Sequence, residues 1–288
     1  MIIFQCNIHD VSRHGCSYCN AAKICIKERK VNTMKKSNKI TFKILAGAAA
    51  LVLIGIMLFV TNAFVGNPIS AMVANKAIIQ YVDQNYSHLD LEIEKARYDF
   101  KNAGYMAKAE SKTSIDTNFA IYYSKGKVQR DDYELFVLGK VNTLKRFSDA
   151  YSVVAKGIIA KELGYENNET MVMHDKDEYE SYKDIIELDM KFDKALPIKS
   201  QVVIQLDITD SSLEGIAKIF VDAHKAFQEN DCNFSAYSMF AENGDTAVSI
   251  YGVTPKHIES GDLVSLLERA KNSESAEGIG VYIKEATK

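Results

Sequence analysis

Cysteine is almost absent from the part of this chain that is long enough to fold, and tryptophan is absent altogether. Four of the five cysteines occur by residue 25, and the fifth is Cys232. A single cysteine cannot form a disulfide within the long remaining part, so the hydrophobic core of that part must be sufficient for folding. The 288 residues are enough for a membrane segment and one large or two small domains.

The common short motifs of catalysis and cofactor binding are also missing. The sequence has no phosphate-binding loop of the Walker type, no Gly-x-Gly-x-x-Gly and no His-x-x-x-His pair. No serine occupies a Gly-x-Ser-x-Gly nucleophile elbow, and Gly278-Ile279-Gly280 is too short for a nucleotide loop. The motifs therefore assign no catalytic residue and no cofactor.

Charge is missing from residues 44–65, which read ILAGAAALVLIGIMLFVTNAFV. A helix needs about 20 apolar residues to cross the hydrocarbon core of a bilayer. Because backbone groups in lipid must hydrogen-bond within their own segment, this run predicts a transmembrane helix. A cleaved signal peptide, with an apolar region of about 7–15 residues, is one alternative. A buried helix of a soluble protein, which is usually shorter than this run, is another.

The lysines around the run predict its direction. The first basic residue after it is Lys76, whereas four lysines closely precede it: Lys35, Lys36, Lys39 and Lys43. Basic residues collect on the cytoplasmic side of membrane proteins, so the N-terminus is expected in the cytoplasm and residues 66–288 outside it. We therefore expect a single-pass protein of the cell membrane whose larger part is extracytoplasmic.

The two sides of the run differ in net charge. Residues 1–65 carry nine Lys and Arg against two Asp and Glu, whereas residues 66–288 carry 26 against 36. An acidic exterior argues against nucleic acid as a partner and against broad docking on anionic lipid. The expected partners are the membrane that the helix spans and a protein or another ligand of the cell envelope.

The first residues contain material for a metal site. Zinc takes four nitrogen or sulfur ligands in a tetrahedron, and the candidate ligands are Cys6, His9, Cys16, Cys19 and Cys25. The gap from His9 to Cys16 is short for a zinc finger, and few apolar residues surround it. Residues 1–33 are also interpreted as an over-extended gene start, with translation from Met34, or as part of a disordered basic cytoplasmic tail over 1–43.

Residues 66–130 predict a first small α+β domain. Asn67 and Pro68 are a good N-cap and first residue for a helix through about residue 85. Apolar alternation then predicts strands near residues 89–93, 105–109 and 119–123, with a bulge or bend near Lys95. One helix packed on an antiparallel sheet is the expected architecture.

Residues 131–166 predict one long connecting helix. From Asp132 the apolar residues recur every three or four positions, and Gly164 is a suitable C-terminal stop. The stripe consists of Leu135, Leu138, Val141, Leu144, Phe147, Tyr151, Val154 and Ile158.

Residues 167–288 predict a second small α+β domain, also with a helix on an antiparallel sheet. Strands are expected at 171–173, 186–192 and 202–208, and a capping box at Ser211-x-x-Glu214 starts a helix. Asn243-Gly244 predicts a hairpin between 234–240 and 247–251, followed by a helical region from Pro255 and a last strand at 279–283. The expected fold is α+β: an N-terminal transmembrane helix, then two small α+β domains joined by the long helix.

Few residues of this exterior suggest chemistry. His224 falls on the apolar stripe of its helix, which favours a core or boundary histidine, and Cys232 could act as a nucleophile only with a base beside it. The acidic run Asp175-x-Asp177-Glu178-x-Glu180 lacks the glycine of a calcium loop, so a solvated face is favoured. Four tyrosines of the first sheet could form a binding face, although tyrosines in sheets are more often half-buried: Tyr98, Tyr105, Tyr122 and Tyr123.

Several stretches resemble one protein family. They are GNPIS (66–70), ARYDFKNAGYMAKAES (96–111), SIDTNFAIYYS (114–124), and the region from ELDMKFDKALPIK (187–199) to GVTPKHIESGDLVSLL (252–267). They are similar to the YfjL-like proteins of Gram-positive bacteria. The resemblance runs from about residue 34 to the end and implies a single-span membrane protein with two exterior domains of unknown function. It assigns no catalytic residues.

We expect a membrane-anchored extracytoplasmic binding or sensing module, with exposed aromatic residues of the first sheet as its contacts. A hydrolase-like enzyme of the cell envelope is the alternative, and it requires His174, Asp175 and a further polar group within hydrogen-bond reach. A eukaryotic membrane protein is a third interpretation, since Asn168-Glu169-Thr170 is a glycosylation acceptor. The tryptophan-free composition, rich in Lys, Asn and Tyr, favours a bacterial protein.

Overall fold

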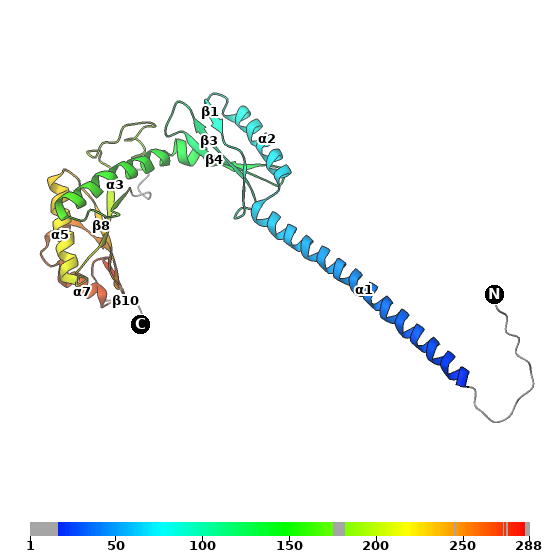
Figure 1. The fold of residues 1–288 in the computed structure, drawn as a ribbon. Helices are drawn as coiled ribbons and strands as arrows, with labels where there is room; N and C mark the ends of the chain where they lie inside the picture. The colour runs from blue at the N-terminus through cyan, green and yellow to red at the C-terminus, as the bar shows by residue number, and fades with distance from the viewer. Residues whose placement is uncertain (1–16, 175–181, 245, 273, 275, 286–288) are drawn as a thin grey trace, which may run out of the picture. The chain divides into compact units, whose positions relative to one another are not determined.

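The computed structural model describes residues 17–285 with the exception of 175–181, 245, 273 and 275. The chain forms two units, which comprise Met1–Gly66 and Asn67–Lys288 (Figure 1). The described part of the first unit is the helix α1, Ser17–Val65. Its segment Ile40–Asn62 is the one described helix that is long and apolar enough to cross a membrane. This N-terminal apolar helix contains most of the predicted span and fits a single-pass membrane protein.

The second unit begins with helix α2, Pro68–Asn85, as the sequence predicts. The Asn67 side-chain oxygen accepts hydrogen bonds from the N–H groups of Ile69 at 2.8 Å and Ser70 at 3.4 Å. These two donors have no partner inside the helix, so the cap fixes where α2 starts.

The first sheet has five antiparallel strands. The strands β1, Leu91–Ile93, and β2, Arg97–Asp99, both pair with β3, Gly104–Ser111. The predicted bend at Lys95 separates them, and the Asn75 side chain holds it by accepting the N–H of Ala96 at 3.1 Å. The sheet continues with β4, Asn118–Ser124, and β5, Lys127–Asp131. The sequence did not predict β5 because this edge strand has a single apolar residue, Val128.

One face of this sheet is covered by α2. Ala74, Ile78 and Val82 of the helix are buried against Ala107 and Ile121 of the sheet. The predicted helix on an antiparallel sheet is therefore confirmed for this half of the unit.

The predicted long helix is interrupted near its start. A short π-helix, η1, spans Glu134–Leu138, and α3 spans Val141–Leu163. Lys140 lies between them in the left-handed region, with φ 56°. Its ammonium group donates hydrogen bonds to the carbonyl oxygens of Lys183 and, at 2.6 Å, of Ile186. These contacts are distant in sequence, so the apolar period cannot reveal the break.

The C-terminal end of α3 agrees with the prediction. Gly164 adopts φ 80°, a left-handed conformation that glycine tolerates better than other residues, and its N–H bonds to the carbonyl of Ala160.

The second sheet has the strand order β10-β9-β8-β7-β6. Its strands are β6, Met171–His174; β7, Ser200–Asp207; β8, Ala236–Asn243; β9, Thr246–Val253; and β10, Gly280–Glu285. The expected fully antiparallel sheet is wrong at one pair, because β7 and β8 run parallel. Helix α5, Leu213–Glu229, lies between them in the chain and provides the crossover that a parallel pair requires.

Two local expectations in this half are corrected. Residues 186–192 form turns and irregular chain instead of a strand, because their apolar side chains fill a small core with α3 that includes Ile186 and Phe147. The cap of α5 is Ser212, one residue later than the predicted Ser211, and its hydroxyl accepts the N–H of Gly215 at 3.1 Å.

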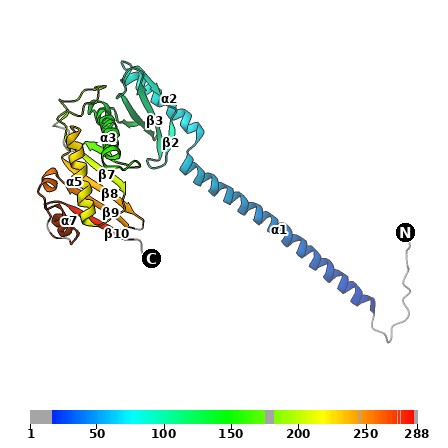
Figure 2. The same ribbon diagram turned by 60° about the vertical axis from the view of Figure 1, so that its left-hand side comes forward.

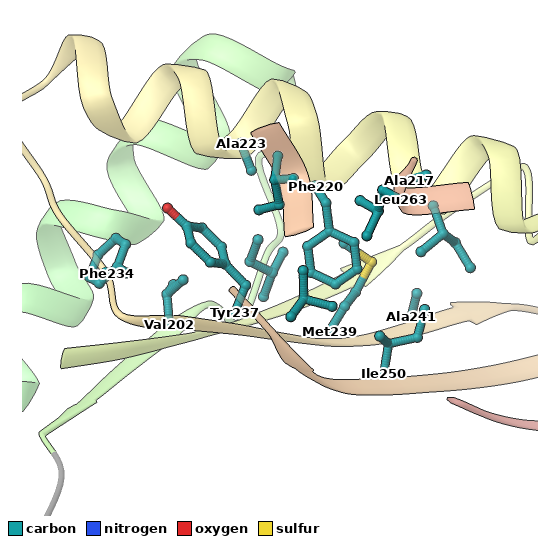
Figure 3. Packing of buried hydrophobic residues seen from close by; sticks show 14 of the residues in the cluster. Val202, Ala217, Phe220, Ala223, Phe234, Tyr237, Met239, Ala241, Ile250 and Leu263 are labelled. Carbon is teal, nitrogen blue, oxygen red and sulfur yellow. The ribbon is translucent and has the colours of Figure 1, made fainter. Parts of the chain in front are cut away.

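The helices α3, α5 and α7, Leu263–Lys271, pack on one face of the second sheet (Figure 2). Thr254 caps the short helix α6, Pro255–Glu259, in the region where a helix is predicted. Phe220 of α5 lies over Tyr237, Met239 and Ile250 of the sheet (Figure 3). On β8 every second residue is buried in this core, namely Tyr237, Met239 and Ala241, so the residues between them lie on the opposite face.

A buried carboxylate joins the segments before and after α3. Asp116, which follows β3, accepts hydrogen bonds from two nitrogens of Arg146 at 2.8 and 2.7 Å and from the N–H of Asp189 at 2.8 Å. In return the Asp189 side chain accepts the N–H of Asp116 at 3.0 Å. We call these three residues the Asp116 clamp.

Candidate binding face of the second sheet

The second sheet turns a set of aromatic side chains away from its core. Phe240 on β8, Tyr251 on β9 and Tyr282 on β10 retain 45, 43 and 62% of their surface exposed. Phe240, Ser249 and Tyr282 occupy neighbouring register positions on three adjacent strands. We call this surface the aromatic face.

The two tyrosines of the aromatic face form a stacked pair. Their ring centroids are 5.7 Å apart and the ring planes differ by 22°. Tyr251 lies opposite Gly280 of β10, and a Cβ atom at Gly280 would come within 2.3 Å of the Tyr251 ring. The ring therefore lies directly on the backbone of Gly280, which only glycine permits.

The remaining residues of the face are mostly uncharged, apart from a row at one end that contains Asp207, Glu242 and Lys284. Ser249 lies between Phe240 and Tyr282, and Gln205 of β7 pairs with Phe240. Met171 and Met173 are exposed on the edge strand β6. Hydrogen bonding to Tyr282 raises the pKa of Tyr251 above its ordinary value. Aromatic residues and methionine are enriched in protein–protein interfaces, where charged residues are depleted.

The sequence had placed the contact aromatics on the first sheet, and the structure corrects this. Tyr105 and Tyr123 are buried under α2. The Tyr105 hydroxyl donates to the carbonyl of Asn67 at 2.9 Å, and Tyr122 donates to Asp132 at 3.0 Å. These tyrosines are structural residues of the sheet, which is the more frequent role of tyrosine in a strand.

The sequence carries a signal for the aromatic face. Phe240, Tyr251 and Tyr282 occupy the outward positions of strands that the sequence did predict. A polar residue is usual at such positions when the face is in water, so bulky aromatics on three adjacent strands mark a surface with another role.

A second group of polar residues surrounds a small pocket beside α3. The Ser200 hydroxyl lies 3.2 Å from Nδ1 of His174, and Tyr151 and Phe192 line the same pocket. Within the described residues, Nε2 of His174 has no hydrogen-bond partner. Burial lowers the pKa of His174, so the imidazole is neutral at pH 7. The Asp175 that the enzyme hypothesis requires lies outside the described residues.

Cys232 does not have the surroundings of a reactive thiol. It is fully buried, and its thiol lies 3.4 Å from the carbonyl of Asn230. Burial raises the pKa of Cys232, which disfavours the thiolate needed for nucleophilic attack.

The other residues singled out by sequence have structural surroundings. His224 is buried, as predicted, between the hydroxyl of Tyr237 at 2.7 Å and Glu259 at 3.0 Å. His257 belongs to the cap of α6, and His88 is exposed in the turn after α2. The Asn168 side chain is buried, and its amide nitrogen, the atom that a glycan would be attached to, donates to the carbonyls of Lys156 and Tyr165.

Most of the metal candidates lie outside the described residues. Cys6, His9 and Cys16 precede Ser17, and the acidic run from Asp175 to Glu180 falls in the gap after β6. Cys19 and Cys25 belong to α1. Over the residues that the structure does describe, no three His, Cys, Asp or Glu side chains converge as a metal site requires.

A groove of about 540 Å³ lies between the end of α3 and α5. Its charged side chains pair along α5: Lys218 lies 2.7 Å from Asp222, and Lys225 lies 3.8 Å from Glu229. Glu162 and Asp210 also line the groove, so its side chains include four carboxylates against two lysines.

Comparison with known proteins supports the resemblance seen in the sequence. Residues 41–132 match the YfjL-like N-terminal domain, and residues 150–268 match the YfjL-like C-terminal domain. The chain belongs to the YfjL-like family. No curated protein and no solved structure matches it. The YfjL-like match ends before β10, so Tyr282 lies beyond the matched residues.

Proposed function

We propose that this YfjL-like protein is a membrane-anchored binding module that holds a protein partner on its aromatic face. The proposal includes the orientation derived from the lysines, with residues 66–288 outside the cytoplasm of a Gram-positive cell. The observation that carries it is the exposed stack of Tyr251 and Tyr282 beside Phe240. A soluble surface has no structural need for these three side chains, whereas an interface does.

The shape of the face favours a protein over a small molecule. Small ligands bind in concave pockets, whereas this surface is the side of a five-stranded sheet. With strands about 4.8 Å apart and about 3.3 Å per residue, it covers roughly 500 Å². A standard interface buries about 800 Å² on each partner, so the face could supply more than half of one. We therefore expect a transient complex of moderate affinity.

Photo-crosslinking in the native cell tests the proposal. The crosslinking amino acid p-benzoylphenylalanine replaces Tyr282 in the full chain, and in a control it replaces Val221, which is exposed on α5 on the other side of the sheet. We expect a discrete adduct at position 282 that is absent at position 221. Phe240→Ala should reduce the yield of this adduct, because it removes part of the contact without touching the crosslinker.

Three results would oppose the proposal. They are equal adducts at both positions, no adduct at position 282, and an adduct with the mass of two copies of this chain. The last result would make the face a self-association surface. Once a partner is identified, Tyr251→Ala should weaken its binding about tenfold, which corresponds to about 1.4 kcal/mol. Val221→Ala should leave binding unchanged.

A hydrolase-like enzyme is the second candidate, and the contact between Ser200 and His174 is the observation that favours it. A neutral histidine beside a hydroxyl is the arrangement that activates a serine nucleophile. Against it, Ser200 is buried and its hydroxyl also lies 3.2 Å from the carbonyl of Ile198. A fluorophosphonate probe should label the full chain if this site is active, and Ser200→Ala should abolish the labelling. An unlabelled wild-type chain would exclude a fluorophosphonate-reactive serine.

A further inference from the structure

The outward face of the first two turns of α2 is apolar. Ile69, Met72 and Val73 are 72, 74 and 54% exposed. The opposite side of the same helix is buried on the first sheet, so α2 is apolar on both sides near its start. Exposed apolar side chains grouped in this way mark a contact surface.

Two lysines stand beside this surface. A shallow hollow of about 550 Å³ is lined by Met72 and Ile79, with Lys76 and Lys95 at its border. Lys95 lies in the bend between β1 and β2, which Asn75 of α2 holds through the N–H of Ala96. The sheet and the helix thus present two positive charges beside one apolar hollow.

The chain itself limits how far this surface can lie from a membrane. Only Gly66 and Asn67 separate the end of α1 from Pro68. The headgroup layer extends about 6 Å beyond the hydrocarbon on each side, and a helix advances about 1.5 Å per residue. With so short a connection, residues 69–73 reach the headgroups when α2 lies along the membrane surface.

We propose that this face of α2, with Lys76 and Lys95, rests on the anionic phospholipid surface of the bilayer that α1 spans. The apolar side chains enter the boundary between headgroups and acyl chains, and the lysines pair with phosphate groups. The acidic net charge of residues 66–288 disfavours broad attraction to the same lipid, so the contact is confined to this patch. The proposal does not depend on the function of the aromatic face.

The absence of tryptophan allows a direct test. Met72→Trp places one reporter on the patch, and Val153→Trp places one on the exposed side of α3 as a control. The full chain is reconstituted in vesicles of phosphatidylcholine and phosphatidylglycerol that carry brominated acyl chains, which quench a buried indole. Circular dichroism verifies that both variants fold.

We expect the reporter at position 72 to emit at shorter wavelength than the control and to be quenched at least about twofold more strongly. Charge reversal with Lys76→Glu and Lys95→Glu should lower the quenching in the anionic vesicles. Equal quenching of the two reporters would overturn the proposal. A shift to shorter wavelength without quenching would also overturn it, because it indicates a protein neighbour. If charge reversal has no effect, the assignment of the lysines is wrong.

Discussion

At the scale of single residues, the Asp116 clamp shows how one carboxylate is kept charged inside the fold. The side chain of Asp116 is 2% exposed. Burial by itself would raise the pKa of Asp116, but hydrogen bonds from Arg146, Thr143 and the N–H of Asp189 outweigh burial and hold the pKa below its ordinary value. The charge is therefore retained at neutral pH, and its partners become structurally essential.

Removing the cation of the clamp should be severely destabilising. Arg146→Met leaves Asp116 buried without its main partner, which costs about 3–5 kcal/mol. The measurement is urea unfolding of the full chain in nanodiscs. Arg97→Met is the matched control, because Arg97 pairs with Glu94 at the surface and its loss costs at most about 1 kcal/mol. Equal losses of unfolding free energy in the two variants would show that the clamp contributes no more to stability than a surface ion pair.

The same carboxylate predicts a pH dependence. Because the folded pKa of Asp116 is depressed, its contribution to stability is complete above the unfolded pKa of about 3.9 and is lost as pH falls through the folded pKa. Asp116→Asn removes this titration, so its unfolding midpoint should fall less steeply with acid below about pH 4 than that of the wild type. If the unfolding midpoints of the two proteins fall in parallel with pH, groups other than Asp116 cause the loss of stability in acid.

Two glycines near the aromatic face should respond differently to alanine. At Gly252, φ is +79° and a Cβ would lie 2.3 Å from the carbonyl oxygen of Gly278, so we expect a loss of about 3 kcal/mol. At Gly280 the obstacle is the movable ring of Tyr251, so the loss should stay below about 1 kcal/mol. Urea unfolding measures both. Gly280→Ala should nevertheless weaken partner binding, since the stack cannot keep its position.

At the scale of elements, α5 joins the two halves of the second sheet and covers its core. The helix begins after β7 and ends before β8, and it buries one side on the strands while the other faces solvent. A crossover of this kind permits parallel neighbours, and it leaves the far side of the sheet for the aromatic face.

Two adjacent residues on α5 should therefore differ in how much their replacement by alanine destabilises the fold. Phe220 is fully buried over the sheet (Figure 3), and Phe220→Ala should cost about 3–5 kcal/mol. Val221 is exposed, and Val221→Ala should change stability by no more than about 0.5 kcal/mol. Thermal unfolding followed by circular dichroism compares them. Similar melting temperatures would contradict the orientation of the helix.

At the scale of the whole molecule, the apolar segment of α1 is the feature that relates the chain to a membrane. One such segment fits a single-pass protein, and the lysines before it give the proposed direction. The aromatic face and the lipid contact of α2 both belong to the unit Asn67–Lys288. An exterior position would restrict their partners to the outer membrane surface and the cell envelope.

The orientation predicts protease access. A tag added after Lys288 should be digested by protease supplied outside intact cells, while a cytoplasmic protein in the same cells stays whole. Replacing Lys35, Lys36, Lys39 and Lys43 by glutamine should protect part of the tag, because it removes the charge difference that sets the direction. A tag that is protected in the wild type would reverse the proposed topology.

The sequence by itself determined the features that depend on neighbouring residues. The apolar run of α1, the Asn67 cap, the Gly164 stop and the hairpin around Asn243-Gly244 follow from length, capping chemistry and turn preference, and each was predicted. These signals are local, because the backbone groups that they satisfy lie within a few residues.

Only the tertiary structure decided the features that depend on distant pairs. The break at Lys140, the parallel pairing of β7 with β8 and the Asp116 clamp each join residues far apart in the chain. The aromatic face has the same origin. The alternation of a strand shows that it has two sides, but the placement of α3, α5 and α7 decides which side is buried and which remains exposed.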